Sequence, residues 1–185
     1  MKTTISVAIA TFNEEKNIAM CLNALKGWVD EIIIDDGSST DNTVKIAKKY
    51  AKVHIIKTTN KAMFHINKQL AINACTSDWT LQLDADEVVS PELKTEILTT
   101  IADTRYNGFW IKRKNYFLGR FLKKGGVYPD PTLRLYRHGM GKLPCKDVHE
   151  QAIVKGLVST LKNDLLHYAD PNFSRYLMRN DRYTS

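Results

Sequence analysis

Three carboxylates follow directly after a predicted strand in the middle of the chain. Residues 79–83 alternate between apolar and polar side chains, as a strand does, and Asp84, Asp86 and Glu87 come at its carboxyl end. Ligands of open α/β sheets bind at the carboxyl ends of the strands. Carboxylate oxygens at this spacing suit Mg²⁺ or Mn²⁺, especially a metal shared with phosphate oxygens. The alternative is an acidic turn that only faces solvent.

Two earlier strand ends also carry polar groups. The first predicted strand, residues 5–9, leads into residues 11–14, and the second ends at Asp35 and Asp36. An acid after the second strand commonly accepts a hydrogen bond from a nucleoside, although Asp36 could instead cap the following helix. Neither a G-x-G-x-x-G nor a Walker A loop is present, so a pyrophosphate bound here would need a metal.

The order of predicted elements brings these strand ends together. Strands are expected near 5–9, 31–36, 53–56 and 79–83, with a helix after each. Apolar residues outline these helices: Ile18, Cys21, Leu22 and Leu25 mark one face of the first, and Ile66, Leu70 and Ala74 outline the third. Two sets are expected to face inward: Val44, Ala47 and Ala51 from the second helix, and Leu93, Ile97 and Ile101 from the fourth. This alternation predicts an α/β fold with a Rossmann-like, doubly wound, mostly parallel sheet.

From residue 108 onward the pattern changes to strands around a basic loop. Short strands are expected near 109–111, 133–136, 151–154 and 165–168. Residues 112–124, between the first two, hold six cations and no acid: Lys112, Arg113, Lys114, Arg120, Lys123 and Lys124. The loop is either an anion-binding surface or a solvated face. Residues 173–183 have helical spacing, and we expect this helix to continue beyond the sequence.

Composition indicates one soluble domain with an acidic partner. The chain has 185 residues, of which 43% are hydrophobic and 25% charged, and no apolar run approaches the ~20 residues that span a bilayer. Three widely spaced cysteines and the lack of a signal peptide favour reduced thiols in the cytoplasm. The net charge of +7 suits nucleic acid, anionic lipid or a phosphorylated substrate.

Seven segments together resemble the family 2 glycosyltransferases, which are inverting enzymes of the GT-A fold. The first three are ATFNE at 10–14, IDDGSSTD at 34–41 and LDADE at 83–87. The other four are similar to the branch that builds lipopolysaccharide cores and surface glycans: NYFLGR at 115–120, GGVYPD at 125–130, LRLY at 133–136 and VHE at 148–150. The chain departs from the family pattern at 60–64 and at Asn67, which replaces a usual glutamine.

The resemblance implies a donor half at 1–107, with Asp36 on the base and Asp86 as the more direct metal ligand. The nucleotide-sugar residues it implies are Thr11, Asn13, Glu14, Asp36, Lys68 and Asp84. The implied ligands of Mn²⁺ or Mg²⁺ are Asp84, Asp86 and His167, although a lone histidine between Leu166 and Tyr168 is also typical of a core or edge position.

The resemblance also implies an acceptor half at 108–170, within one domain spanning 1–170. Glu150 takes the place of the general base, with Asp130 as the other candidate, and Lys123, Lys124 and Arg134 would contact the acceptor. Glu150 could also be a surface acid on a strand edge. The implied reaction moves a hexose from a UDP-linked sugar to a hydroxyl of a bacterial surface glycan or lipopolysaccharide core. It takes place in the cytoplasm, with a peripheral contact to the anionic inner face of the membrane and no nucleic acid partner.

The sequence allows two other classes of function. Asp84, Asp86 and Val88 also satisfy the D-x-D-x-[T/V] pattern of haloacid-dehalogenase-type phosphatases, but no later acidic pair follows Asp86 as that family requires. A non-catalytic glycan- or lipid-binding module on a transferase scaffold is the other alternative.

Overall fold

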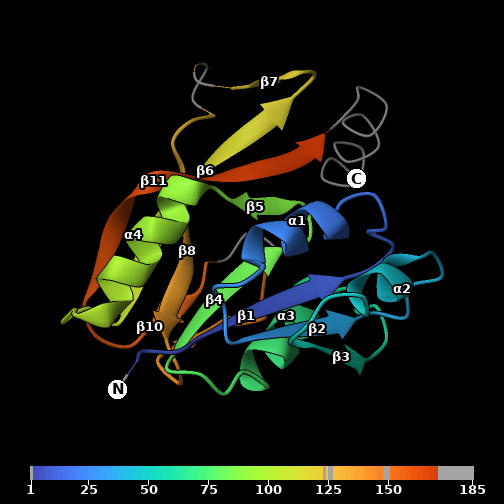
Figure 1. Cartoon of the computed structure of the whole chain (residues 1–185), viewed down its shortest axis with the longest axis horizontal. Coiled ribbons are helices and arrows are strands. Elements are labelled where there is room, and N and C mark those ends of the chain that lie inside the picture. Colours follow the sequence, from blue (N-terminus) through green and yellow to red (C-terminus); the bar gives the residue numbers. More distant parts are fainter. Residues whose placement is uncertain (1, 123, 125–126, 148–150, 171–185) are drawn as a thin grey trace.

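The computed structural model describes residues 2–122, 124, 127–147 and 151–170, and strands and helices alternate in its first half (Figure 1). The helices are α1 (Ile18–Leu25), α2 (Thr43–Ala47), α3 (Phe64–Asn73) and α4 (Pro91–Ala102). The strands are β1 (Ile5–Thr11), β2 (Glu31–Asp36), β3 (Val53–Lys57), β4 (Trp79–Asp84), β5 (Glu87–Val89), β6 (Gly108–Phe117), β7 (Arg120–Phe121), β8 (Asp130–Arg137), β9 (Gly141–Lys142), β10 (Ile153–Val154) and β11 (Val158–Asp170).

One nine-stranded sheet runs through both halves of the chain. Its order is β3-β2-β1-β4-β8-β6-β11-β5, with β7 beside β6, while β9 and β10 form a separate pair. Strands β3, β2, β1 and β4 are parallel. In register, Thr11 lies opposite Asp36, and Ala10 lies opposite Asp84. The predicted α/β fold is confirmed, and the carboxyl ends of β2, β1 and β4 lie at one edge of the sheet.

The second half is mixed in direction, as predicted. Strand β8 is antiparallel to both β4 and β6, and β11 is parallel to β6. The three-residue strand β5 was not predicted, because it is too short to show a period in the sequence. It follows the acidic turn and pairs antiparallel with β11 at the far end of the sheet.

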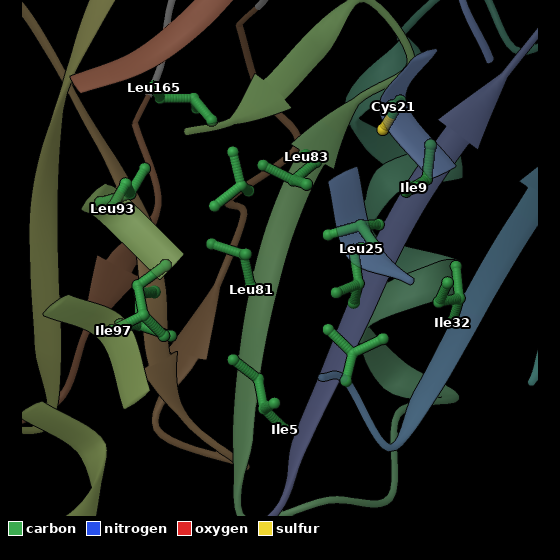
Figure 2. Packing of buried hydrophobic residues seen from close by; sticks show 14 of the residues in the cluster. Ile5, Ile9, Cys21, Leu25, Ile32, Leu81, Leu83, Leu93, Ile97 and Leu165 are labelled. Carbon is green, nitrogen blue, oxygen red and sulfur yellow. The ribbon is translucent and has the colours of Figure 1, made fainter. Parts of the chain in front are cut away.

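A large hydrophobic core lies between the sheet and the helices α1 and α4 (Figure 2). Ile9 and Leu83 from the sheet, Leu25 from α1 and Leu93 from α4 are fully buried there. Helix α4 begins with proline at its first position and with the Ser90 hydroxyl accepting the Leu93 N–H at 3.2 Å. Its predicted inward face, Leu93, Ile97 and Ile101, is confirmed. A smaller core, to which α3 contributes, includes Ala8 of β1 and Ile33 of β2.

Helix α3 is found where the apolar spacing predicts it, but the residues that outline it in the sequence do not mark its buried face. Ile66 and Leu70 are each 37% exposed. The side chains that α3 buries are His65, Asn67, Lys68, Ala71 and Ile72. Three of these are polar and lie inside because they reach hydrogen-bond and ion-pair partners there, so apolar spacing alone indicates the wrong face. Ala51, predicted to point inward from α2, is exposed and lies beyond the end of that helix at Ala47.

Cys21 and Cys75 are buried, at 1% and 2% exposure. Burial raises the pKa of both thiols, that of Cys75 to about 12. Both are therefore protonated at neutral pH and contribute apolar contact area, not nucleophilic chemistry.

The helix predicted at 173–183 falls outside the described part of the chain. Within the described ranges, no helix is long and apolar enough to cross a membrane.

Candidate active site

The carboxyl ends of β1, β2 and β4 place Thr11, Asp36 and Asp84 along one edge of the sheet. These are the strand ends at which the sequence predicts a ligand site. The turn after β4 carries Asp86, and β5 begins at Glu87. Strand register therefore brings Thr11, Asp36 and Asp84 together.

Asp36 is 1% exposed and organises the turn that follows β2. Its Oδ1 accepts the Ser39 hydroxyl at 2.6 Å and the Thr11 hydroxyl at 3.2 Å, and its Oδ2 accepts the Ser39 N–H at 3.0 Å. Because α2 begins only at Thr43, Asp36 caps the turn and not the helix. A carboxylate offers about four lone-pair directions, so Asp36 retains capacity for a further donor.

Asn13 and Glu14 tie the loop after β1 to the loop after β2. Asn13 has a left-handed φ of 55°, a conformation that asparagine adopts more readily than most residues. Its N–H donates to the Ser39 hydroxyl at 2.9 Å, and its Oδ1 accepts the Thr40 N–H at 2.8 Å. The Glu14 N–H donates to the Thr43 hydroxyl at 2.8 Å. These contacts fix the shape of the predicted nucleotide side.

Asp84 is held between two buried cations. Arg134 donates from Nη2 to Asp84 Oδ2 at 2.7 Å, and Lys68 Nζ pairs with Oδ1. Burial alone would raise the pKa of Asp84, but the two ion pairs outweigh it and hold that pKa well below its usual value. Burial lowers the pKa of Lys68, an effect that Asp84 only partly offsets. Asp84 is therefore a carboxylate at neutral pH, with both oxygens engaged.

Glu87 completes this ion-pair network and had no assigned role in the sequence. It is 0% exposed, and its Oε2 accepts the Asp84 N–H at 2.9 Å. Its Oε1 lies 2.7 Å from Arg134 Nη2 and 3.6 Å from Arg113 Nη1. A sequence signal existed, because an arginine within the apolar strand 133–136 needs a buried acidic partner.

The predicted acceptor residues lie in different surroundings. Arg134 is 6% exposed and bonds Gln82, Asp84 and Glu87, so the structure places it beneath the donor side and not on a surface open to an acceptor. Lys124 is exposed. Lys123 and Glu150 lie outside the described residues.

His167 contacts Asp86 on one side, and on the other side Asn115 links it to Asp130. His167 Nε2 lies 3.6 Å from Asp86 Oδ2, and His167 Nδ1 lies 2.6 Å from Asn115 Oδ1. The Asn115 amide donates to Asp130 Oδ2 at 3.3 Å. Arg113 holds the same oxygen from Nε at 2.8 Å and from Nη2 at 2.7 Å.

Asp86 and His167 fit a divalent metal that takes its remaining ligands from a substrate. Among the residues that the structure describes, no three His, Cys, Asp or Glu side chains gather as a metal site, and Asp84 is turned toward Lys68 and Arg134. Mg²⁺ commonly binds through one or two protein ligands plus phosphates and water. Two ligands about 2.1 Å from one ion lie roughly 3–3.5 Å apart, close to the observed 3.6 Å. A metal held here would neutralise charge on a bound diphosphate.

Solved structures share this fold, among them the two complexes that follow. TarS of S. aureus, in its complex with UDP, superposes with a TM-score of 0.69 at 19% identity, covering 95% of this chain and 63% of that one. The mannosyltransferase PcManGT of Pyrobaculum calidifontis, in complex with GDP-Man and Mn²⁺, gives 0.67 at 14% identity, covering 98% and 61%. The architecture is that of GT-A glycosyltransferases.

Sequence comparison supplies the family. The model of "Glycosyl transferase family 2" matches residues 6–161, so the chain belongs to this family. An uncharacterised glycosyltransferase of Rickettsia typhi is 40% identical over 135 residues, which cover 71% of this chain but only 46% of that protein. The lipopolysaccharide core biosynthesis glycosyltransferase LpsC of Rhizobium meliloti is 26% identical over the whole chain and 70% of its own length. Family membership excludes the phosphatase alternative.

Proposed function

We propose that the chain transfers a hexose, with inversion, from a UDP-linked sugar to a hydroxyl of a bacterial surface glycan or lipopolysaccharide-core acceptor. The observation that carries the proposal is the alignment of Thr11, Asp36 and Asp84 at neighbouring strand ends, beside Asp86 and His167. The base, ribose and diphosphate of a bound nucleotide sugar could then bind one after another along this edge of the sheet, each beside hydrogen-bonding groups. The likeness to LpsC supports the choice of acceptor.

On the donor side, Asp36 accepts a hydrogen bond from the base, and Asp86 and His167 hold Mn²⁺ or Mg²⁺. The metal neutralises the leaving diphosphate when bound. Lys68, 9% exposed and paired with Asp84, supplies a further positive charge beside that diphosphate. Arg134 keeps Asp84 ionised, and Glu87 holds both Arg134 and the Asp84 N–H in place.

On the acceptor side, Glu150 removes the proton of the attacking hydroxyl, and no covalent enzyme intermediate forms. Lys123 and Lys124 attract an anionic acceptor. The net charge of +7 suits a peripheral contact with the anionic cytoplasmic face of the membrane, where a lipid-linked acceptor would be available.

Nucleotide binding is expected to depend on a divalent metal that Asp86 holds. Calorimetric titration with UDP should show binding in Mn²⁺ that weakens at least tenfold in EDTA. Asp86→Ala should reproduce the EDTA result, because it removes a ligand but leaves the Asp84 ion pairs intact. Asp103→Ala, at the end of α4, serves as a matched control and should bind like wild type. Equal UDP affinity in Mn²⁺ and EDTA would remove the metal from the proposal.

Asp36→Ala is expected to weaken UDP binding by about 1–3 kcal/mol, the value of a hydrogen bond to a charged group. Because Asp36 also holds the turn after β2, Ser39→Ala is the control: it removes the hydroxyl contacts of Ser39 with Asp36 and with the Asn13 N–H but leaves the carboxylate. Thermal melts and UDP calorimetry on both variants separate the two roles. If both lose stability equally and neither loses UDP affinity, Asp36 only caps the turn.

A further inference from the structure

The segment 115–120 is similar in sequence to family 2 glycosyltransferases, but it has no role in the proposed transfer reaction. Its first residue, Asn115, lies on β6 between two neighbouring strands. In register it is opposite His167 of β11, and two residues earlier Arg113 is opposite Asp130 of β8. Asn115 is therefore placed by backbone pairing between one carboxylate and one imidazole.

The orientation of the Asn115 amide follows from Asp130. An ionised carboxylate can only accept hydrogen bonds, so the NH₂ group of the amide must face it, as it does at 3.3 Å. Arg113 fixes this carboxylate oxygen with two contacts at 2.7 and 2.8 Å. The opposite end of the amide, the carbonyl oxygen, is then directed at His167 Nδ1, 2.6 Å away.

The amide orientation in turn decides which ring nitrogen of His167 carries hydrogen. A carbonyl oxygen can only accept, so Nδ1 must be the N–H donor. In the neutral imidazole the lone pair then lies on Nε2, and that atom is the one 3.6 Å from Asp86 Oδ2. His167 Nε2 and Asp86 Oδ2, 3.6 Å apart, are therefore suited to bind the same cation.

We propose that Asn115 is a positioning residue that holds His167 in the Nδ1–H tautomer, with Nε2 directed toward Asp86, and links this pair to Asp130 on the acceptor half. The part that concerns metal affinity rests on the proposed function, in which His167 and Asp86 hold the metal. Loss of such a hydrogen-bonded support typically lowers metal affinity by ~10–100-fold.

The first test reads the tautomer directly, without any metal. Long-range ¹H–¹⁵N spectra of the metal-free protein, at a pH where the ring is neutral, distinguish Nδ1–H from Nε2–H, and His167→Gln identifies the signal. Wild type should show Nδ1–H, and Asn115→Leu should shift the population toward Nε2–H. The double variant Asn115→Asp with Asp130→Asn keeps an oxygen toward His167 and an amide–carboxylate contact between the two positions, and it should retain Nδ1–H. An Nε2–H signal in wild type, or no change in Asn115→Leu, would overturn the proposal.

The second test measures Mn²⁺ binding by electron paramagnetic resonance in the presence of UDP. Asn115→Leu should weaken binding by ~10–100-fold. The control is Asn163→Leu, on the same strand as His167, whose amide donates instead to Glu96 at 2.8 Å and whose loss should leave Mn²⁺ affinity unchanged. If His167→Gln abolishes binding while Asn115→Leu does not, the positioning role is wrong and the metal site stands. If wild type binds no Mn²⁺, the metal assignment fails, and the tautomer spectra alone decide the role of Asn115.

Discussion

Arg134→Met is expected to lower the free energy of unfolding by about 3–5 kcal/mol, because it leaves buried carboxylates without their main cation. Glu87 is fully buried, and the only cation left paired with it in the described part of the chain would be Arg113, 3.6 Å away. Asp84 would keep only Lys68. Urea denaturation monitored by circular dichroism measures the change.

Arg137→Met, on the same strand, is the control for loss of an arginine side chain. Its guanidinium donates to the Thr104 carbonyl at 2.7 Å and lies over Trp79, so its loss should cost only about 1 kcal/mol. Adding Glu87→Gln to Arg134→Met should recover part of the stability, because it removes one unpaired charge. A loss no larger than that of Arg137→Met would show that the ion pairs contribute little.

The same network predicts how stability depends on pH. The folded protein holds the pKa of Asp84 well below the value near 3.9 of an unfolded aspartate. The stabilisation by its ion pairs is therefore complete above about pH 4 and is lost as the pH falls through the folded pKa. In Arg134→Met this acid-dependent part of the unfolding free energy should shrink.

Glu150→Gln is expected to lower the rate of sugar transfer by ~10²–10⁴-fold, the usual contribution of a general base. Glutamine keeps the shape of the side chain but cannot take a proton from the acceptor hydroxyl. UDP affinity should change little, because donor binding depends on other residues. Transfer rates and UDP titrations on the same preparations provide both measurements.

Asp130→Asn is the comparison that separates the two candidate bases. The Asp130 carboxylate is engaged by Arg113 and Asn115, an arrangement suited to orienting its neighbours. We therefore expect it to affect metal affinity more than proton removal. An inactive Asp130→Asn beside a near-normal Glu150→Gln would move the base to Asp130. Absence of transfer from every nucleotide sugar tested would favour the non-catalytic binding module.

The parallel half of the fold was predictable because its signals are local. Residues 31–36 and 79–83 show strand periodicity, and Ser90 followed by proline marks a helix start. The carboxyl ends of adjacent parallel strands must meet, so the alignment of Asp36 with Asp84 followed from topology alone.

The charge network beneath the donor side was not predictable in the same way. Its members come from α3, β4, β5, β6 and β8, and no sequence spacing relates Lys68 to Arg134. The burial of α3 shows the cause: Lys68 and Asn67 point inward because their partners there are carboxylates, which hydrophobic periodicity does not register. Asn67 donates to Asp35 at 2.6 Å, a contact that only the folded chain reveals.

The length of the acidic turn constrains the shape of the whole sheet. Strands β4 and β5 are joined by only two residues, Ala85 and Asp86, yet three strands, β8, β6 and β11, lie between them in the sheet order. Four steps of ~4.8 Å across a flat sheet would separate them by about 19 Å. A tether from Asp84 to Glu87 can reach at most about 11 Å. The sheet must therefore bend so strongly that β5, at its far edge, returns to the carboxyl end of β4, and the acidic turn joins these two parts of the sheet. Lengthening that turn by a few flexible residues would relax the curvature and separate Asp86 from His167, even with every side chain of the site intact.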